Sequence, residues 1–312
     1  MSSDQLSTLL PFPVTTPEGQ ELLSSGTLVT ETLVRELASI GKRKSYPNRT
    51  IQQHGHLLAD LEQFMRSNHY AHIFGGESSI RKVLACLGEI AIPIPLLEAI
   101  EQLKTHDYLT YRHSLIVFAL SELLLEICPD DNSERHDVLL VGPTHDLGKL
   151  FLSQELLTKD TPLNREELEF IEAHTVAGYA LLSYYLGDHL HPAAQTSLNH
   201  HERRNGHGYP RGIREIEPLV EMVSICDVYD ALISPRPYRV GCYDNRTALE
   251  ELSDLAEHGA MNWHYIQALI SRNRTDHPPP ETIEVSHDRR GEAPKINAHG
   301  QLADSLKSQP DT

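Results

Sequence analysis

The chain has 312 residues, which is enough for one large domain and a smaller one. Its formal net charge of −17 argues against general nucleic-acid binding, because that function needs a basic surface. The sequence has no run approaching roughly 20 apolar residues and no basic segment ahead of an apolar one, so we expect neither a membrane span nor a signal peptide. Four scattered cysteines without CxxC spacing predict reduced thiols and a cytoplasmic location.

The predicted elements are almost all helical, so the expected fold class is all-α. Residues 1–20 are polar and contain prolines, which predicts a mobile lead-in. Residues 21–104 have helical spacing but no recognised motif, which predicts a smaller N-terminal helical domain, a candidate for regulation. Residues 105–272 have a stronger helical pattern and predict a helical bundle. Residues 273–312 are polar and proline-bearing, which predicts a disordered tail.

Nineteen histidines are more than a chain of this length needs for packing, so metal chemistry is a hypothesis to test. Several potential ligands continue or adjoin apolar helical stripes. His145 follows Val141 by four residues, and Asp227 follows Val223 by four. The candidates identified in this way are His113, His145, Asp146, His174, His200, His201 and Asp227.

Successive candidates are 26 to 32 residues apart, about the length of one helix, a connection and part of the next helix. Antiparallel helices would therefore bring them to one level, where buried imidazoles and carboxylates are costly unless paired or metal-bound. Five imidazoles and two carboxylates could hold two cations with one bridging carboxylate. Ligands without thiolate suit iron, manganese or zinc better than calcium.

The alternative at each position is an ordinary histidine on an apolar helix face, which is usually a hydrogen-bonded core residue. His–Asp neighbours also occur by chance, as His106–Asp107 and His136–Asp137 show in this chain. What favours the metal hypothesis is that all the candidates occur together, in one order and at helical-hairpin spacing.

Residues 107–263 resemble the HD-GYP family, a branch of the HD metal-dependent phosphohydrolases. The segment of residues 200–212 fits the HHExxxGxGYPxG signature of that family at every fixed position. The segments that carry the resemblance are YLTYRHS (108–114), HDLGK (145–149), EAHTVAG (172–178), HHERRNGHGYPRG (200–212), CDVYDAL (226–232) and RPYR (236–239). The resemblance implies a catalytic domain over residues 105–272.

The activity implied by the resemblance is hydrolysis of cyclic di-GMP to pGpG, GMP or both, through a binuclear centre of iron or manganese with a bridging hydroxide. The resemblance implies that one metal is held by His113, His145, Asp146 and Asp227. It also implies that Asp146 bridges to a second metal on His174, His200 and His201. Implied substrate contacts are Lys149, which would also be catalytic together with Asp146, and Asp230, Arg236 and Arg239. The loop of Gly208, Tyr209 and Pro210 would close over the site or contact a partner.

Departures from the family pattern refine these expectations. Leu109 occupies a position where some members have a glutamate that helps to bind a third metal, so we expect two metals. Pro143 interrupts an apolar helix just before His145, where a kink would shift the ligand slightly. Pro235 replaces a polar residue that is more usual before RPYR.

Other functions remain open at this point. The same chemistry could act on another cyclic dinucleotide such as cyclic GMP-AMP, or the site could serve a cyclic di-GMP sensor or interaction protein. A hydrolase of ordinary nucleotides is a third alternative. The family resemblance also suggests diguanylate cyclase (GGDEF) domains as partners, and the first hundred residues could mediate dimerisation.

Overall fold

The computed structural model describes residues 6–127, 135–235, 241–285 and 289–291. The described part of the chain is mainly helical, which confirms the predicted fold class. The helices before residue 107 are α1 (Glu31–Lys44), α2 (Leu57–Met65), α3 (Ala71–Phe74), α4 (Glu77–Glu89) and α5 (Ile94–His106), with the 3₁₀ helix η1 (Ile51–Gln53). The later helices are α6 (Tyr108–Ile127), α7 (Arg135–Thr144), η2 (Leu147–Phe151), α8 (Gln154–Leu157), α9 (Arg165–Glu172), α10 (His174–Leu186), α11 (Pro192–Asn199), α12 (Pro218–Ile233), α13 (Asn245–Glu257), α14 (Trp263–Asn273) and η3 (Pro280–Thr282).

The N-terminal segment differs from the prediction. Residues 7–30 are not a mobile lead-in followed by helix but form short antiparallel ribbons in which β1 (Ser7–Leu9) pairs with β4 (Leu28–Thr30) and β2 (Val14–Thr15) with β3 (Glu21–Leu23). Leu10 and Val14 are fully buried. Paired backbone groups and buried apolar side chains outweigh the local effect of the prolines here. The third ribbon pairs β5 (Asn48–Thr50) with β6 (Ala91–Pro93).

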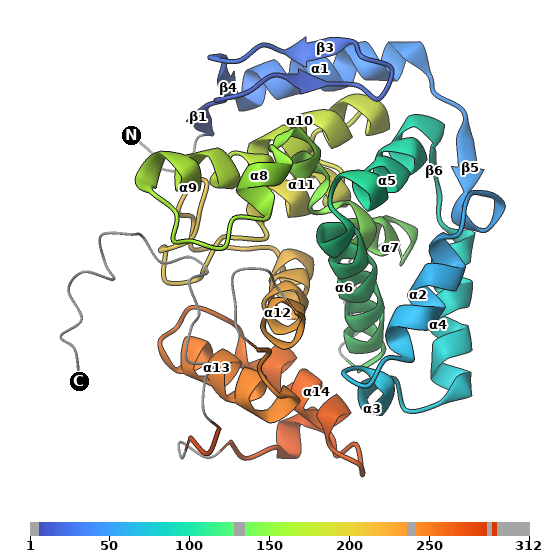
Figure 1. Ribbon diagram of the computed structural model, residues 1–312, viewed down its shortest axis with the longest axis vertical. Coiled ribbons are helices and arrows are strands. Elements are labelled where there is room, and N and C mark those ends of the chain that lie inside the picture. The colour runs from blue at the N-terminus through green and yellow to red at the C-terminus, as the bar shows by residue number, and fades with distance from the viewer. Residues whose placement is uncertain (1–5, 128–134, 236–240, 286–288, 292–312) are drawn as a thin grey trace.

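Helices α6 and α10 form the interior of the molecule. Figure 1 shows α6 running through the middle, with α12 on one side and α2 and α4 on the other. Helix α10 is covered by α1 on one side and by α11 and η2 on others. A helix enclosed on all sides is apolar around its circumference, and polar side chains on it need partners. Among the described residues, no helix has both the length and the apolar character that crossing a membrane requires.

Pro143 lies inside α7, one residue from its end. The helical hydrogen bonding continues past it, because the His145 N–H donates to the Val141 carbonyl at 3.0 Å. Pro143 therefore does not interrupt the helical hydrogen bonding that extends to His145.

The segment after α14 begins as ordered structure, so the predicted disordered tail starts too early. The Gln267 side chain donates to the Ile283 carbonyl at 3.1 Å, and Ser271 donates to the Pro278 carbonyl at 2.7 Å. Ile283 is buried in the core. Most of the remaining predicted tail, residues 286–288 and 292–312, lies outside the described residues. The predicted division at residue 104 stays a prediction, and the buried hydrophobic side chains form one cluster across that position.

Candidate metal centre

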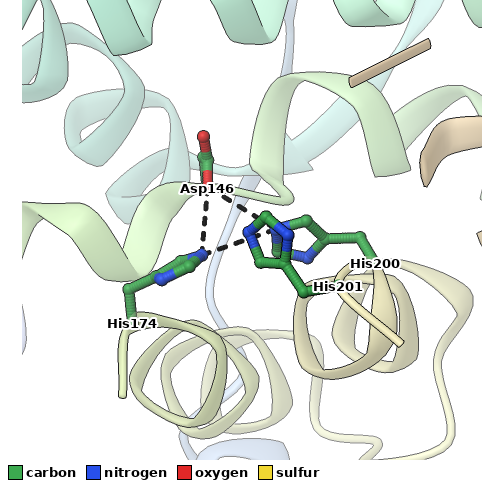
Figure 2. A group of neighbouring side chains, drawn as sticks. All are labelled: Asp146, His174, His200 and His201. Atoms are coloured by element: carbon green, nitrogen blue, oxygen red, sulfur yellow. Dashed lines mark hydrogen bonds and ion pairs between the residues drawn. The ribbon is translucent and has the colours of Figure 1, made fainter. Parts of the chain in front are cut away.

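Seven potential ligands converge in two groups where α6, α10, α11 and α12 meet. His113 on α6, His145 directly after α7 and Asp227 on α12 form the first group. The second group consists of Asp146, His174 at the start of α10, and His200 and His201 after α11, and Figure 2 shows these four side chains facing one another. Within each group, one ligand atom per residue lies within 4.8 Å of the others. The groups contain all the residues that the sequence predicts as ligands.

Asp146 lies between the two groups. Its Oδ1 is 3.3 Å from His174 Nε2 and 3.7 Å from His200 Nε2, in the second group. Its Oδ2 is 3.5 Å from His145 Nε2 and 3.8 Å from His113 Nε2, in the first group. One oxygen facing each group is the arrangement that a bridging carboxylate needs.

The backbone fixes the orientation of three histidines in these groups. The Nδ1 atoms of His145, His174 and His200 lie 2.7, 2.5 and 3.0 Å from the carbonyl oxygens of residues 142, 171 and 196. A carbonyl can only accept, so each Nδ1 carries the proton and each Nε2 presents a lone pair to the interior of the site. This is the tautomer that binds a metal through Nε2.

Several buried atoms at the centre lack suitable protein partners. His145 Nε2 and Asp146 Oδ1 are buried without a hydrogen bond, and His174 Nε2 lies 3.4 Å from His200 Nε2, so two lone pairs face each other. His113 Nε2 lies 2.9 Å from Asp227 Oδ1, so a proton or a cation must stand between these two acceptors. Because unpaired buried acceptors are costly, this donor set fits bound cations.

The charges at the site also suit a cation. Burial lowers the pKa of His145 to about 4, and burial likewise lowers the pKa values of His174 and His201. Burial alone would raise the pKa of Asp146, but the Lys149 ammonium and the neighbouring histidines hold it well below its usual range. At neutral pH these three imidazoles are therefore neutral and the Asp146 carboxylate is ionised, as a divalent cation requires of its ligands.

Lys149 lies at the edge of the site. It is in η2, and its Nζ is 2.7 Å from Asp146 Oδ2. Its side chain is partly exposed, so the ammonium lies between the buried carboxylate and solvent. This position suits the predicted contact with a phosphate group.

Asp230 has a different place from the one predicted. It was expected to contact substrate, but it is fully buried behind His113 and lies 2.6 Å from His113 Nδ1. A carboxylate in that place orients the imidazole and leaves Nε2 to face the metal position. Its separation of three residues from Asp227, which puts both on one helix face, was the available signal for this role. The other predicted substrate residues, Arg236 and Arg239, lie outside the described residues.

The loop of residues 206–212 supports His201. The Tyr209 ring stacks on the His201 ring with centroids 4.6 Å apart, and the Tyr209 N–H donates to the His201 carbonyl at 3.2 Å. Pro210 follows in a cis peptide. Gly208 lies so close to the chain after His201 that a Cβ there would be 2.4 Å from the His201 carbonyl oxygen. The residues expected to cover the site therefore lie against a ligand.

Glu202 shapes this loop, and the sequence interpretation did not assign it a role. Its buried carboxylate accepts the N–H groups of Arg211 at 2.8 Å and Ile213 at 3.1 Å. Its place directly after the histidine pair, within the HHE motif, was the available signal. The Arg203 guanidinium bonds the His200 carbonyl at 3.1 Å and Ser224 on α12 at 2.8 Å.

Two glycines set the spacing of the helices that carry the ligands. A Cβ at Gly148 would lie 1.8 Å from the His174 carbonyl oxygen, so η2 and α10 are in backbone contact there. A Cβ at Gly178 would lie 2.3 Å from Ser197 Oγ, and that hydroxyl donates to the His145 carbonyl at 2.9 Å. At these points the segments meet through backbone atoms and the Ser197 hydroxyl.

Comparison with known proteins agrees with this site. A family model described as HD domain matches residues 95–261, more than half of the chain. The chain is 34% identical over 147 residues to a cyclic di-GMP phosphodiesterase of Thermotoga maritima, covering 46% of this chain and 40% of the relative. It is 35% identical over 169 residues to a cyclic di-GMP phosphodiesterase of Pseudomonas aeruginosa, covering 53% and 38%. It is 31% identical over 151 residues to the 3′3′-cGAMP-specific phosphodiesterase 1 of Vibrio cholerae, covering 48% and 33%.

Among solved structures, an HDG“Y”P protein from Bdellovibrio bacteriovorus is 18% identical with a TM-score of 0.44, covering 86% of this chain and 96% of the other.

The chain belongs to the HD domain family. Its membership of the HD-GYP branch, predicted from the motifs, is confirmed. The chain spans about two fifths of the length of the first two of these curated relatives.

Proposed function

We propose that this chain is a metal-dependent phosphodiesterase that hydrolyses cyclic di-GMP to pGpG, GMP or both. The observation that carries the proposal is Asp146, whose two oxygens face two separate groups of buried ligands. Two relatives named cyclic di-GMP phosphodiesterases support the substrate class. Iron or manganese fits the nitrogen and oxygen donors of the two groups.

Each group of residues has a distinct part in the proposed reaction. Bound cations supply Lewis-acid chemistry, which activates water and offsets charge on the phosphodiester. The backbone-held histidines keep Nε2 toward the cations, and Asp146 joins the two groups. Lys149, whose ammonium lies at the solvent edge of the site, binds a non-bridging phosphate oxygen or donates a proton to the leaving oxygen. Arg236 and Arg239 bind phosphate or guanine.

A second substrate is favoured by the relative named as specific for 3′3′-cGAMP. The same ligands and the same lysine would serve that cyclic dinucleotide, because the phosphodiester chemistry is identical and only a base differs. Competition between cyclic di-GMP and 3′3′-cGAMP, measured as the ratio of kcat/KM values, distinguishes the two proposals. Diguanylate cyclase domains and a second copy of the chain are the partners that we propose from the family resemblance.

The test is a product assay on the full chain loaded anaerobically with Mn(II) or Fe(II). We expect cyclic di-GMP to be converted to pGpG or GMP, and His145→Ala or Asp146→Ala to abolish turnover. His264→Ala is the control, because His264 is exposed on α14. Turnover that survives both site changes would refute the mechanism. Tight binding without turnover under every metal condition would favour the sensor function.

A further inference from the structure

Tyr70 connects the N-terminal region to the metal centre. It directly precedes α3 and is fully buried. Its hydroxyl donates to Asp230 Oδ1, across a separation of 160 residues in sequence. Asp230 is in turn the residue whose Oδ2 accepts the His113 Nδ1–H at 2.6 Å. The Asp230 carboxylate therefore lies between Tyr70, which is outside every recognised motif, and the proposed metal ligand His113.

Arg112 limits the directions of the hydrogen bonds around Asp230, because it can only donate. Its Nη2 donates to Tyr70 Oη at 3.0 Å, and its Nη1 donates to Ser234 Oγ at 2.9 Å. A guanidinium has no acceptor, so neither hydroxyl can donate to it, and both protons are available for other partners. Ser234 also donates to Asp230 Oδ2 at 3.0 Å. Tyr70 Oη and Ser234 Oγ also lie 3.0 Å apart, and each hydroxyl has an oxygen of the Asp230 carboxylate, the group that orients His113, as an acceptor.

The backbone around Tyr70 is held against the last helices of the described chain. The Asn245 side chain on α13 donates to the His69 carbonyl at 3.2 Å. The His72 ring lies 2.9 Å from the carbonyl oxygen of Asn273 at the end of α14. These contacts on both sides of Tyr70 keep its ring in the interior. Arg112 Cζ lies over that ring, 5.3 Å from its centroid.

We propose that Tyr70 is a positioning residue for the metal ligand His113, acting through Asp230, so that residues of the N-terminal region complete the metal centre. The inference rests on the proposed function, since it requires His113 to be a ligand. With Tyr70 and Ser234 donating, the Asp230 carboxylate has one orientation, in which Oδ2 holds the Nδ1 proton of His113. The Nε2 lone pair then faces Asp227 and the first group of ligands. Loss of the phenol hydroxyl removes one of these donors and loosens the imidazole.

The test compares Mn(II) binding to metal-free full-length protein, wild type against Tyr70→Phe. Partners behind a metal-bound histidine are typically worth about 10- to 100-fold in metal affinity, so we expect the Kd of one class of Mn(II) sites to rise about tenfold or more. Binding at the second group should change little, because His174 and His200 in that group are held by backbone carbonyls and not by Asp230. Ser234→Ala provides a second variant and should raise the same Kd in the same direction.

Tyr111→Phe is the matched control. Tyr111 is also buried, and its hydroxyl also donates to a carboxylate, Asp60 Oδ2 at 2.6 Å, which is not part of the metal centre. A role of Tyr70 limited to packing would give Tyr70→Phe and Tyr111→Phe the same Mn(II) affinities as wild type, and that result would overturn the inference. Wild-type protein that binds no Mn(II) would instead overturn the proposed function itself, so the two failures can be distinguished.

Discussion

Replacement of Gly208 by alanine should disturb the second group of ligands and leave the first intact. The backbone at this position adopts no positive φ, so space and not conformation excludes a side chain. A Cβ would lie 2.4 Å from the His201 carbonyl oxygen and 2.5 Å from the Arg203 nitrogen, and both atoms are backbone. Ordinary contact requires 3.4 Å or more, so the loop must move by 1.0 Å (3.4 − 2.4).

The energetic consequence follows from what this movement disrupts. The hydrogen bond from the Tyr209 N–H to the His201 carbonyl already has an N···O distance of 3.2 Å, and the centroids of the two rings are 4.6 Å apart. Movement of the loop therefore weakens both contacts. Forcing an extra methyl into a packed site costs about 1–3 kcal/mol. If this energetic cost falls on the metal-bound state alone, metal binding weakens by roughly 5- to 150-fold, at about 1.4 kcal/mol per factor of ten.

The assay is calorimetric titration of metal-free protein with Mn(II), in parallel with steady-state turnover of cyclic di-GMP. Gly88→Ala on α4 is the control, because its Cβ would make only ordinary contacts of 3.5 Å or more, with the side chains of Gln52 and Leu58. We expect Gly208→Ala to weaken one class of site and to lower kcat, and Gly88→Ala to change neither. Two undiminished classes of site in Gly208→Ala, with wild-type turnover, would refute the reasoning.

Three further predictions concern pH, a lysine and the metal. The pKa of His145 is about 4 in the folded protein and about 6.5 in an unfolded chain, so as pH falls the unfolded state gains a proton first. The metal-free protein should lose about 2 kcal/mol of unfolding free energy between pH 7 and pH 5 from this group, and denaturant midpoints that stay constant over this range would contradict the assignment. Lys149→Gln should lower kcat by roughly 10²- to 10⁴-fold with unchanged metal stoichiometry, so a wild-type rate excludes it as the proton donor. Chelation should lower Tm and Mn(II) should restore it, because metal at a free concentration of about 100 times Kd adds about 2.7 kcal/mol to the free energy of unfolding. An unchanged melting curve would argue against bound cations.

The grouping of the candidate ligands could be predicted because their signal is repetitive and local. His145 and Asp227 each continue an apolar helical stripe, and regular hairpin spacing brings such positions together. The spacing of these residues along the chain therefore predicts which of them come together. Asp146 as the residue between the groups was implied by the family resemblance and agrees with its distances to both.

The supporting residues could not be predicted in the same way. Tyr70 and Asp230 are 160 residues apart, and no local pattern indicates that they meet. In sequence, Asp230 stands out only by its separation of three residues from Asp227, and the packing around α12 is needed to show that it is buried behind His113. The strands of residues 7–30 are two or three residues long, too short for an alternating pattern to distinguish them from a loop.

The backbone contacts at Gly148 and Gly178 have a consequence for how this chain can vary. At these two points the segments that carry Asp146 and His174 meet through peptide groups and a serine hydroxyl. We therefore expect exchanges among leucines and valines elsewhere in the core to change the separation of the two groups of candidate ligands less than a side chain at Gly148 or Gly178 would. We therefore expect the apolar core to tolerate changes of sequence that leave the candidate ligands in place, provided that Gly148 and Gly178 remain without a side chain.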